Sequence, residues 1–364
     1  MALSESAQKP VQEQLQTRKQ KERAALDYPF PAPTADGQVV EVAPGVLWAR
    51  MPMPMSLDHI NVYLLDDGDG WFLIDTGLNT EASRDVWQTV AEQSFRGLPV
   101  KGLICTHFHY DHAGLARWLM EHFDAPLYMT HGEYYTLRAL ATSRGDMGSE
   151  RQKDFYLRSG MSESQIDKML KACQRDPFMG DYPPDFNRLR EGQQLNIGGR
   201  NWQILIGEGH SPEHACLYCE QDSLLIAGDQ LLPEISSNVL VSDVEPEADP
   251  LSLWLASLDK LSQIESDTLV MPSHGPVFKN VHCRVEQLHQ HHQRQLDLVM
   301  KKARATTGFT AYEALKWMFD RELGAVETML AQGETHAHLS WLLKQKELVR
   351  ETGDAGVDRY SAAV

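Results

Sequence analysis

The sequence lacks any long apolar run, although hydrophobic residues make up 42% of its 364 positions. A helix that crosses a membrane needs about 18 or more consecutive apolar residues, and no stretch approaches that length. The N-terminal segment MALSESAQKPVQEQLQTRKQ also lacks the apolar centre of a secretory signal. The sequence therefore predicts a cytoplasmic protein with no membrane partner.

Cysteine is scarce, and the five residues of this type show no framework of paired spacings. Structural disulfides are therefore not expected. Cys216 and Cys219 have the CxxC spacing of many zinc sites, but no second pair accompanies them. The surrounding ACLYCE predicts a strand, in which alternation places the two thiols on opposite faces. We expect no metal at this pair.

Basic residues are outnumbered, with 34 Lys plus Arg against 51 Asp plus Glu and a formal net charge of −17. An acidic protein binds nucleic acid or anionic membranes poorly, because contact with phosphate depends on clustered Lys and Arg. A glycine-rich phosphate loop and an internal repeat are absent as well. We therefore expect a small-molecule substrate, and a nucleic-acid partner is disfavoured.

Predicted strands and helices alternate along the chain, which is typical of an α/β protein with helices outside its sheets. Early apolar runs separated by turn residues predict antiparallel strands at VLWARM, INVYLL and WFLID. Helical spacing of apolar residues follows in TEASRDVWQTVAEQSF, before a buried strand at VKGLICTH. Later strands are expected at PLYMTH, QQLNIGG, WQILIGEG, ACLYCEQ, SLLIAGD and TLVMPSHG.

Three regions are predicted: a polar, solvated tail over residues 1–28, an α/β unit over 29–283, and a helical C-terminal domain over 284–364. Within the α/β unit, residues 132–188 are helix-forming and broken by Gly and Pro, so we expect an inserted lid or substrate wall. Its aromatic side chains could line a pocket for an acyl chain, although helix packing is the commoner role of such residues. They are Tyr134, Tyr135, Phe155 and Tyr156.

The stretch THFHYDHAG, residues 106–114, concentrates metal-binding side chains between a predicted strand and a predicted helix. His107 and His109 are one residue apart in extended chain, so they point the same way and can share a metal ion. Asp111 and His112 follow at the bend into the helix, where they can address a second ion. A loop of merely hydrogen-bonded histidines would leave a costly polar cluster without a purpose.

This stretch matches the HxHxDH motif of the metallo-β-lactamase superfamily, and four accessory motifs occur in that family's order. They are LIDTG (73–77), GHSPEH (209–214), AGDQL (227–231) and PSHGP (272–276). The sequence resembles this superfamily over residues 38–283. The resemblance implies an αββα sandwich, with two mixed sheets flanked by helices, and the tail adds a helical C-terminal appendage.

The resemblance also implies a site for two divalent metal ions. Zinc is the first choice, while iron and manganese also accept such ligands. Asp75 would accept a hydrogen bond that orients a ligand histidine. His214 would either support the site or face the substrate, or it would simply close the turn before the next strand. The implied ligands are His107, His109 and His210 for the first ion, Asp111, His112 and His274 for the second, and Asp229 as the bridge.

Such a centre ionises water at neutral pH and stabilises an anionic transition state. We therefore expect a hydrolase in which hydroxide held between two metals attacks the carbonyl of a small ester, thioester or lactone. The predicted catalytic residues are Asp111, Asp229 and His214. Two alternatives stay open: a metal-dependent endoribonuclease or phosphodiesterase, and a ligand-binding regulatory protein of the same fold.

The presence of both Asp229 and His274 resembles the hydroxyacylglutathione hydrolase, lactonase and nuclease branches of the superfamily. The stretch from GHSPEH onward is similar to glyoxalase II-like hydrolases and to the lactamase-like endoribonuclease with a small winged-helix-like C-terminal domain. ETHAHLSWLLKQKELVRE, which predicts a helix and then a wing, resembles that appendage. The basic residues that anchor glutathione and the clamp domain of tRNA-processing nucleases are not found, which favours another small substrate.

Further histidines occur in the C-terminal region at 289, 291 and 292, and at 336 and 338. His289 and His292 share a helix face, but no carboxylate or cysteine completes a metal-binding set beside them. We expect solvated or interface helix faces at these positions. The C-terminal domain would then serve as a lid or as the contact of a homodimer.

Overall fold

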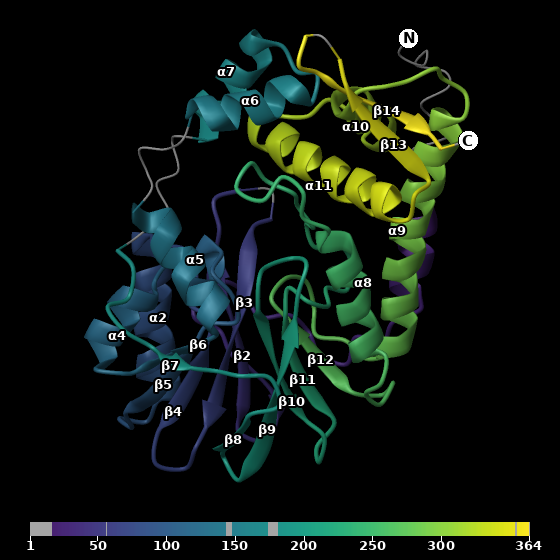
Figure 1. Ribbon diagram of the computed structural model, residues 1–364. Coiled ribbons are helices and arrows are strands. Elements are labelled where there is room, and N and C mark those ends of the chain that lie inside the picture. Colours follow the sequence, from purple (N-terminus) through teal and green to yellow (C-terminus); the bar gives the residue numbers. More distant parts are fainter. Residues whose placement is uncertain (1–16, 56, 143–147, 174–180, 354, 364) are drawn as a thin grey trace.

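The computed structural model describes residues 17–363 except 56, 143–147, 174–180 and 354. Two mixed β-sheets pack face to face, and helices cover both outer faces (Figure 1). This is the expected αββα sandwich with a largely helical C-terminal region. Residues 1–16 of the predicted tail and residues 143–147 and 174–180 of the predicted insertion lie outside the described part.

The first sheet contains seven strands in chain order, antiparallel from β1 to β4 and parallel from β4 to β7. The parallel half begins where the pattern changes from hairpins to strands joined by helices. The strands are β1 (Val40–Ala43), β2 (Val46–Pro52), β3 (His59–Asp66), β4 (Trp71–Ile74), β5 (Val100–Ile104), β6 (Leu127–Met129) and β7 (Asn187–Arg188).

The second sheet has five strands in the order β12-β11-β10-β9-β8. β11 and β12 are parallel, and the remaining pairs are antiparallel. Consequently β9, β11 and β12 run in the same direction and end at the same edge of the sheet. The strands are β8 (Gln194–Ile197), β9 (Arg200–Gly207), β10 (His214–Cys219), β11 (Leu224–Gly228) and β12 (Leu269–Pro272).

The core between the sheets is built from the inward-facing side of each strand. Trp48 and Tyr63 of the first sheet meet Trp202 and Ile226 of the second, and all four are buried. Burying one large apolar side chain contributes roughly 1.5–3 kcal/mol, so this contact holds the two sheets in a fixed relation. The strand ends that carry the predicted ligands are thereby brought to a common edge.

Strand β10 is buried on both faces, and its alternation separates the two thiols of the CxxC pair. Leu217 and Cys219 face the core between the sheets, whereas Cys216 and Tyr218 face the core beneath the outer helices. The expectation that the cysteines point to opposite faces is confirmed. No cluster of metal-ligating side chains within the described residues includes either thiol.

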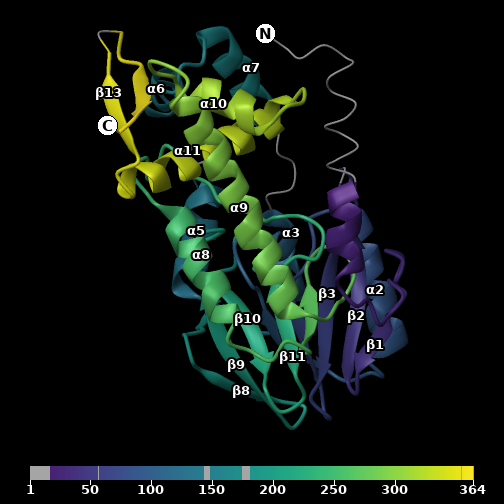
Figure 2. The ribbon, with the colours of Figure 1, turned by 90° about the vertical axis from the view of Figure 1, so that its right-hand side faces the viewer.

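Each outer face is covered by helices with one apolar stripe. On the first sheet, α2 begins at Thr80, whose hydroxyl accepts a hydrogen bond from the Ser83 amide, and buries Val86, Trp87 and Val90. The helices on this face are α2 (Glu81–Ser94), α4 (Ala116–Phe123) and α5 (His131–Thr142). α8 (Pro250–Leu261) and α9 (Val281–Ala303) cover the second sheet (Figure 2).

The segment predicted as one lid is divided between two regions. α5 packs on the first sheet through Tyr134 and Leu137. In contrast, α6 (Glu150–Arg158) and α7 (Glu163–Cys173) lie beside α10 (Ala311–Met318) and α11 (Ala325–Lys344), as Figure 1 shows. Their apolar residues, including Tyr156 and Ile166, form a small core with Tyr312 and Met329 of the C-terminal helices. The described helices of 132–188 therefore pack in two places, and the role of this segment as an inserted lid or substrate wall stays a prediction.

The C-terminal region ends in an antiparallel hairpin, β13 (Leu348–Thr352) and β14 (Asp358–Ala362), after α9, α10 and α11. The helix-then-wing pattern predicted for this end of the chain is thus present. Thr310 and Glu313 form a capping box that fixes the start of α10. The expected boundary between 283 and 284 falls near the first turn of α9, and it stays a prediction.

Residues 17–24 form a short helix that contacts the protein body. The carbonyl of Glu22 accepts a hydrogen bond from Gln287 of α9, and Leu26 is buried in the core beneath the outer helices. Asp27 forms a β-bridge with Lys279. The described part of the predicted solvated tail is therefore docked, because an apolar residue and backbone hydrogen bonds hold it in place.

None of the helices in the described part of the chain combines the length and the apolar character that a membrane crossing requires.

Candidate metal centre

The predicted ligands come from loops at one edge of the sandwich. Residues 106–109 follow β5 and lead into α3 (Tyr110–Ala113), which carries Asp111 and His112. His210 follows β9, Asp229 follows β11 and His274 follows β12. Because the carboxyl ends of these strands meet between the two sheets, ligands far apart in the sequence lie together.

The first cluster contains His107, His109, His210 and Asp229, whose ligand atoms all lie within 4.8 Å of one another. His107 Nε2 is 2.8 Å from His109 Nδ1 and 3.3 Å from His210 Nε2. His210 Nε2 is 3.5 Å from Asp229 Oδ2. Three nitrogens and one oxygen therefore converge on one point, which is the donor set of many zinc and iron sites.

The second cluster contains Asp111, His112 and His274. His274 Nε2 is 3.2 Å from Asp111 Oδ2, and His112 Nε2 is 3.6 Å from the same oxygen. Asp229 again takes part, since its Oδ1 lies 3.5 Å from both His112 Nε2 and His274 Nε2. The two oxygens of Asp229 thus face different clusters, which is the arrangement of a bridging carboxylate.

The donor atoms fit a pair of cations. His112 Nε2 and Asp229 Oδ1 are buried and have no hydrogen-bond partner within the described residues. Leaving such atoms without a partner costs about 1–3 kcal/mol each, so a buried pair aimed at one point calls for a ligand. The two clusters therefore suggest a dinuclear metal site; they do not identify the metal.

Two ligand histidines are oriented by backbone carbonyls. His210 Nδ1 lies 2.7 Å from the carbonyl oxygen of Asn238, and His274 Nδ1 lies 2.9 Å from that of His59. A carbonyl only accepts, so Nδ1 carries the proton in both rings. Each Nε2 lone pair is consequently free to point into its cluster, as a metal ligand requires.

Asp75 is positioned to orient His112, as the resemblance implied. Its Oδ2 lies 2.9 Å from His112 Nδ1 and accepts a hydrogen bond from the Thr106 hydroxyl, while Oδ1 accepts from the Thr106 amide. Asp75 has a φ of 61°, in the left-handed region that costs a non-glycine residue about 1 kcal/mol or more. This backbone strain is offset by the contacts that the carboxylate makes.

His214 lies behind Asp229, with both ring nitrogens engaged. Its Nε2 accepts a hydrogen bond of 3.0 Å from the Asp229 amide, and its Nδ1 is 3.7 Å from Cys216 Sγ. The ring is fully buried against Gly228, where an added Cβ would lie 2.4 Å from His214 Cε1 and Nε2. Of the roles left open for His214, this geometry fits support of the site.

Burial and neighbouring charges set the protonation of the cluster. Burial lowers the pKa of His107 well below its usual value and that of His109 to about 3. Burial opposes charge on His274 as well, but the carboxylates of Asp229 and Asp111 outweigh it and raise the pKa. The histidines of the first cluster with lowered pKa values are thus neutral donors at pH 7.

Two buried residues that the sequence did not single out hold the ligand loops together. Glu133 of α5 accepts hydrogen bonds from the Phe108 amide at 3.0 Å and from the Ser211 hydroxyl and Glu213 amide, both at 2.7 Å. It therefore ties the loop of the HxHxDH motif to the loop that carries His210. A glutamate in the first turn of a helix has no distinguishing signal in the sequence.

Asn61 of β3 performs the same task for the turn that carries His274. Its side-chain amide donates to the carbonyls of Pro272 at 2.8 Å and Gly275 at 2.7 Å, and the hydroxyl of Tyr63 donates to Pro272 as well. These bonds cross from the first sheet to the second. The alternation of β3 predicts inward-facing positions, but it does not say which loop they contact.

The four aromatic residues predicted for a substrate pocket have different environments. Tyr134 stacks on Phe186 with a centroid distance of 4.0 Å, and Tyr156 lies in the small core beside the C-terminal helices, so both take part in packing. Phe155 is partly buried against His336. Tyr135 is 49% exposed, and it stays available as a substrate contact.

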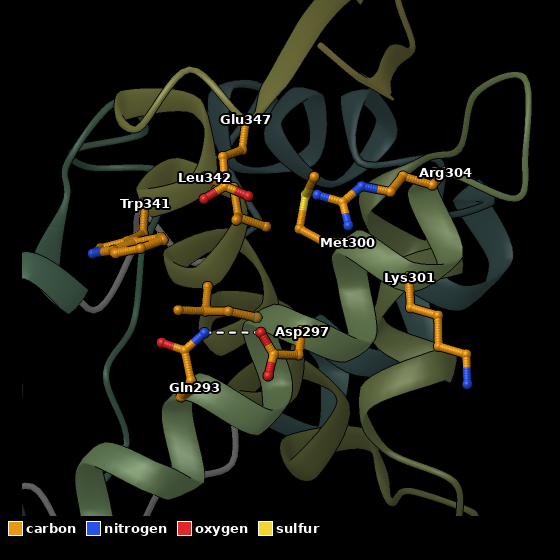
Figure 3. A pocket seen from close by; sticks show the side chains of 9 residues that line it. Gln293, Asp297, Met300, Lys301, Arg304, Trp341, Leu342 and Glu347 are labelled. Carbon is orange, nitrogen blue, oxygen red and sulfur yellow. Dashed lines mark hydrogen bonds between the residues drawn. The ribbon is translucent and has the colours of Figure 1, made fainter. Parts of the chain in front are cut away.

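A surface cavity of about 460 Å³ lies elsewhere, between α9 and α11 (Figure 3). Gln293 and Asp297, which are hydrogen-bonded at 2.8 Å, Lys301 and Arg304 lie along one side, and Trp341 lies across from them. None of its lining residues belongs to either ligand cluster.

Comparison with known proteins agrees with the site. Residues 55–274 match the Metallo-beta-lactamase superfamily model, and residues 296–363 match the model of the Metallo-beta-lactamase-like, C-terminal domain. The probable metallo-hydrolase YqjP of Bacillus subtilis is 26% identical over 309 residues, which cover 82% of this chain and 92% of that protein.

Two solved structures extend the likeness to both regions. A beta-lactamase domain protein from Burkholderia ambifaria is 42% identical, with a TM-score of 0.87 over 94% of this chain and 100% of that chain. A metallo-beta-lactamase family protein from Thermus thermophilus is 27% identical, with a TM-score of 0.71 over 88% of this chain and 100% of that chain. With the His/Asp site of a metallo-hydrolase and the C-terminal domain that accompanies it, the chain belongs to the metallo-β-lactamase superfamily.

Proposed function

We propose that the protein is a dinuclear, metal-dependent hydrolase of a small ester, thioester or lactone. The observation that supports the proposal best is the position of Asp229 between the two clusters, where one carboxylate oxygen faces each cluster. Zinc is the proposed metal, because the first cluster combines three imidazoles with one carboxylate. Two divalent cations at this site would polarise a carbonyl oxygen and lower the pKa of water toward about 7.

The residues of the chain have distinct tasks in this reaction. The histidines would hold the cations, and Asp229 would bind both of them. Asp111 and Asp229 are the carboxylates next to the reacting centre, so they would accept the proton of the attacking water. His214 would fix Asp229 from behind, since its ring nitrogens already face the Asp229 amide and Cys216.

The charge of the chain supports a small substrate. The formal net charge is −17, and this net charge would repel a polyanion such as RNA. We propose that Tyr135 contributes to the wall of the substrate cleft. Its ring contacts His131 at a centroid distance of 4.6 Å, and the neighbouring Gly132 amide donates to Glu213 in the loop that carries His210.

The proposal is tested with metal-free protein that is reloaded with zinc, iron or manganese. Hydrolysis of short acyl thioesters, aryl esters and lactones is compared with cleavage of a phosphodiester and of single-stranded RNA. We expect metal-dependent release of acid from at least one acyl substrate, and its loss in Asp229→Ala and His274→Ala. A matched control is His289→Ala, whose ring pairs with Asp259 on the surface of α9 and α8.

Two results would contradict the proposal. Cleavage of the phosphodiester or RNA without acyl hydrolysis would favour the nuclease. A protein that binds two metal ions and hydrolyses nothing in the panel would favour a ligand-binding regulatory role.

A further inference from the structure

The irregular segment Asp229–Val241 supports the first ligand cluster through two consecutive residues. The hydroxyl of Ser237 donates a hydrogen bond to the carbonyl of Asp229. The carbonyl of Asn238 accepts from His210 Nδ1 at 2.7 Å. The position of this segment therefore decides where the bridging carboxylate and one ligand imidazole lie.

The segment is itself held by helices of the C-terminal region. Arg284 of α9 is 4% exposed, and its guanidinium donates to the carbonyls of Leu232 and Ile235, the latter at 2.8 Å. The amide of Val241 donates to the carbonyl of Gly333 in α11 at 3.1 Å. Charge-assisted bonds from a buried guanidinium are stronger than neutral ones, so α9 anchors the segment firmly.

Two of the C-terminal histidines continue this support as a hydrogen-bond chain. His338 Nδ1 lies 2.8 Å from the carbonyl of Glu334, so it must donate, and His338 Nε2 is left as an acceptor. His292 Nδ1 lies 3.2 Å from that nitrogen and must donate to it. His292 Nε2 is then an acceptor and lies 3.4 Å from the hydroxyl of Ser236, whose other acceptor is the carbonyl of Ser237 at the same distance. Each nitrogen of both rings thus has a hydrogen-bond partner within reach.

A metal ion is not needed to explain this pair. Only two nitrogens face each other, and the described residues supply no third ligand atom nearby. Burial lowers the pKa of His338 to about 4 and that of His292 well below its usual value. Both rings are therefore neutral at pH 7, as the direction of the hydrogen bonds requires.

We propose that His292 and His338 are positioning residues that, with Arg284, hold Ser236–Asn238 so that His210 and Asp229 are presented to the first metal ion. The C-terminal domain would thus set the metal affinity of a site to which it contributes no ligand. This inference rests on the proposed metal site, and it assigns a role to histidines that the sequence alone predicts on solvated or interface helix faces.

The chain offers a matched control on the same helix. His336 is also buried in α11, but its Nε2 lies 2.7 Å from the hydroxyl of Ser159, on the side of α6. His338→Leu and His336→Leu therefore each remove one buried imidazole and its hydrogen bond to a neighbouring side chain. A gentler pair is Ser236→Ala against Ser159→Ala, which removes the hydroxyl partners and leaves the helices intact.

The experiment measures metal affinity in the full chain by competition with a chromophoric zinc chelator, and the denaturation midpoint of the metal-free protein. The visible spectrum of the cobalt-loaded protein reports ligand geometry. Substitution of a residue that hydrogen-bonds to a metal ligand typically lowers metal affinity by about 10–100-fold. We expect His338→Leu to weaken zinc binding about tenfold and to alter the cobalt spectrum, whereas His336→Leu lowers the midpoint similarly but changes affinity less than about twofold.

Ser236→Ala should weaken binding relative to Ser159→Ala, and His338→Gln, which can still donate and accept, should restore most of the affinity. Equal metal affinity in the two members of each pair would overturn the proposal. The proposal would also be overturned if the wild-type protein bound a third equivalent of metal and His338→Leu did not, because His292 and His338 would then be metal ligands. Wild-type protein that binds two metal ions and hydrolyses no substrate would count against the proposed function alone.

Discussion

Substitution of Gly228 by alanine tests the support that His214 gives to Asp229. Gly228 has a φ of +54°, a conformation that costs an L-residue about 1–2 kcal/mol. In addition, the new Cβ would lie 2.4 Å from Cε1 and Nε2 of the buried His214 ring, which must then move. Its movement breaks the hydrogen bond from the Asp229 amide, and an unpaired buried amide costs about 1–3 kcal/mol.

The sum predicts that Gly228→Ala lowers the free energy of unfolding by about 2–5 kcal/mol. Gly192→Ala is the control, because Gly192 has a φ of +72° and no atom within 4 Å of the added Cβ. Both changes stiffen the unfolded chain equally, so the difference between them reports the contacts of the added Cβ, of which those with His214 at 2.4 Å are much closer than that with Thr106 Cβ at 3.2 Å. The control should lose only about 1–2 kcal/mol.

Urea denaturation of metal-free protein gives both free energies, and metal analysis after dialysis gives the occupancy of the site. Gly228→Ala should also lose metal that Gly192→Ala retains, since Asp229 is displaced. Equal stability of the two variants, within about 0.5 kcal/mol, together with full metal content in Gly228→Ala, would refute the role given to His214.

Three further outcomes follow from the site and its surroundings. Asp75→Asn places an amide group opposite His112 Nδ1, or turns the side-chain oxygen away from it, so His112 is held less well. Metal affinity measured by chelator competition should fall about 10–100-fold, while circular dichroism should show that the fold is retained. Removal of metal by a chelator should lower the melting temperature, since metal at about 100 times its dissociation constant stabilises the native state by about 2.7 kcal/mol, and calorimetry with stepwise zinc addition should reverse the shift. Burial raises the pKa of Glu334 from 4.5 to about 7, so its contribution to stability is complete below pH 4.5 and is lost as the pH rises through 7. Glu334→Gln should therefore raise the melting temperature relative to wild type more at a pH about one unit above that pKa than at one about two units below it, and an equal difference at both would contradict the shift.

The alternation of strands and helices along the sequence predicted the α/β layering, whereas the sandwich itself was implied by the resemblance of the motifs to the metallo-β-lactamase superfamily. The burial of β2 alternates between buried and half-buried positions over most of its length, and α2 has one apolar stripe. The residue pattern itself predicted the cluster at residues 107–112, and the resemblance implied that His210, Asp229 and His274 join it. The structure supplies the physical reason, because each ligand follows a strand and these strands end at one edge of the sandwich. The histidines and Asp229 therefore lie where the motifs placed them.

Contacts between distant elements were not predictable. The apolar faces of α6 and α7 are visible in the sequence, but their partner is not, and they pack on the C-terminal helices. Glu133 and Asn61 are ordinary polar residues until their loops are placed beside them. His292 and His338 were expected on solvated or interface faces, yet they are buried and bonded to each other. A helical period shows which residues share a face but not what covers it.

Neither half of the sandwich holds a complete ligand set. His107, His109, Asp111 and His112 belong to the half with the seven-stranded sheet, whereas His210, Asp229 and His274 belong to the other half. Strong chelation therefore cannot precede docking of the halves during refolding, and a fragment with one sheet should bind zinc only weakly. The rate of tight metal binding during refolding therefore measures docking of the two halves, and metal ions present at that step would stabilise the native state.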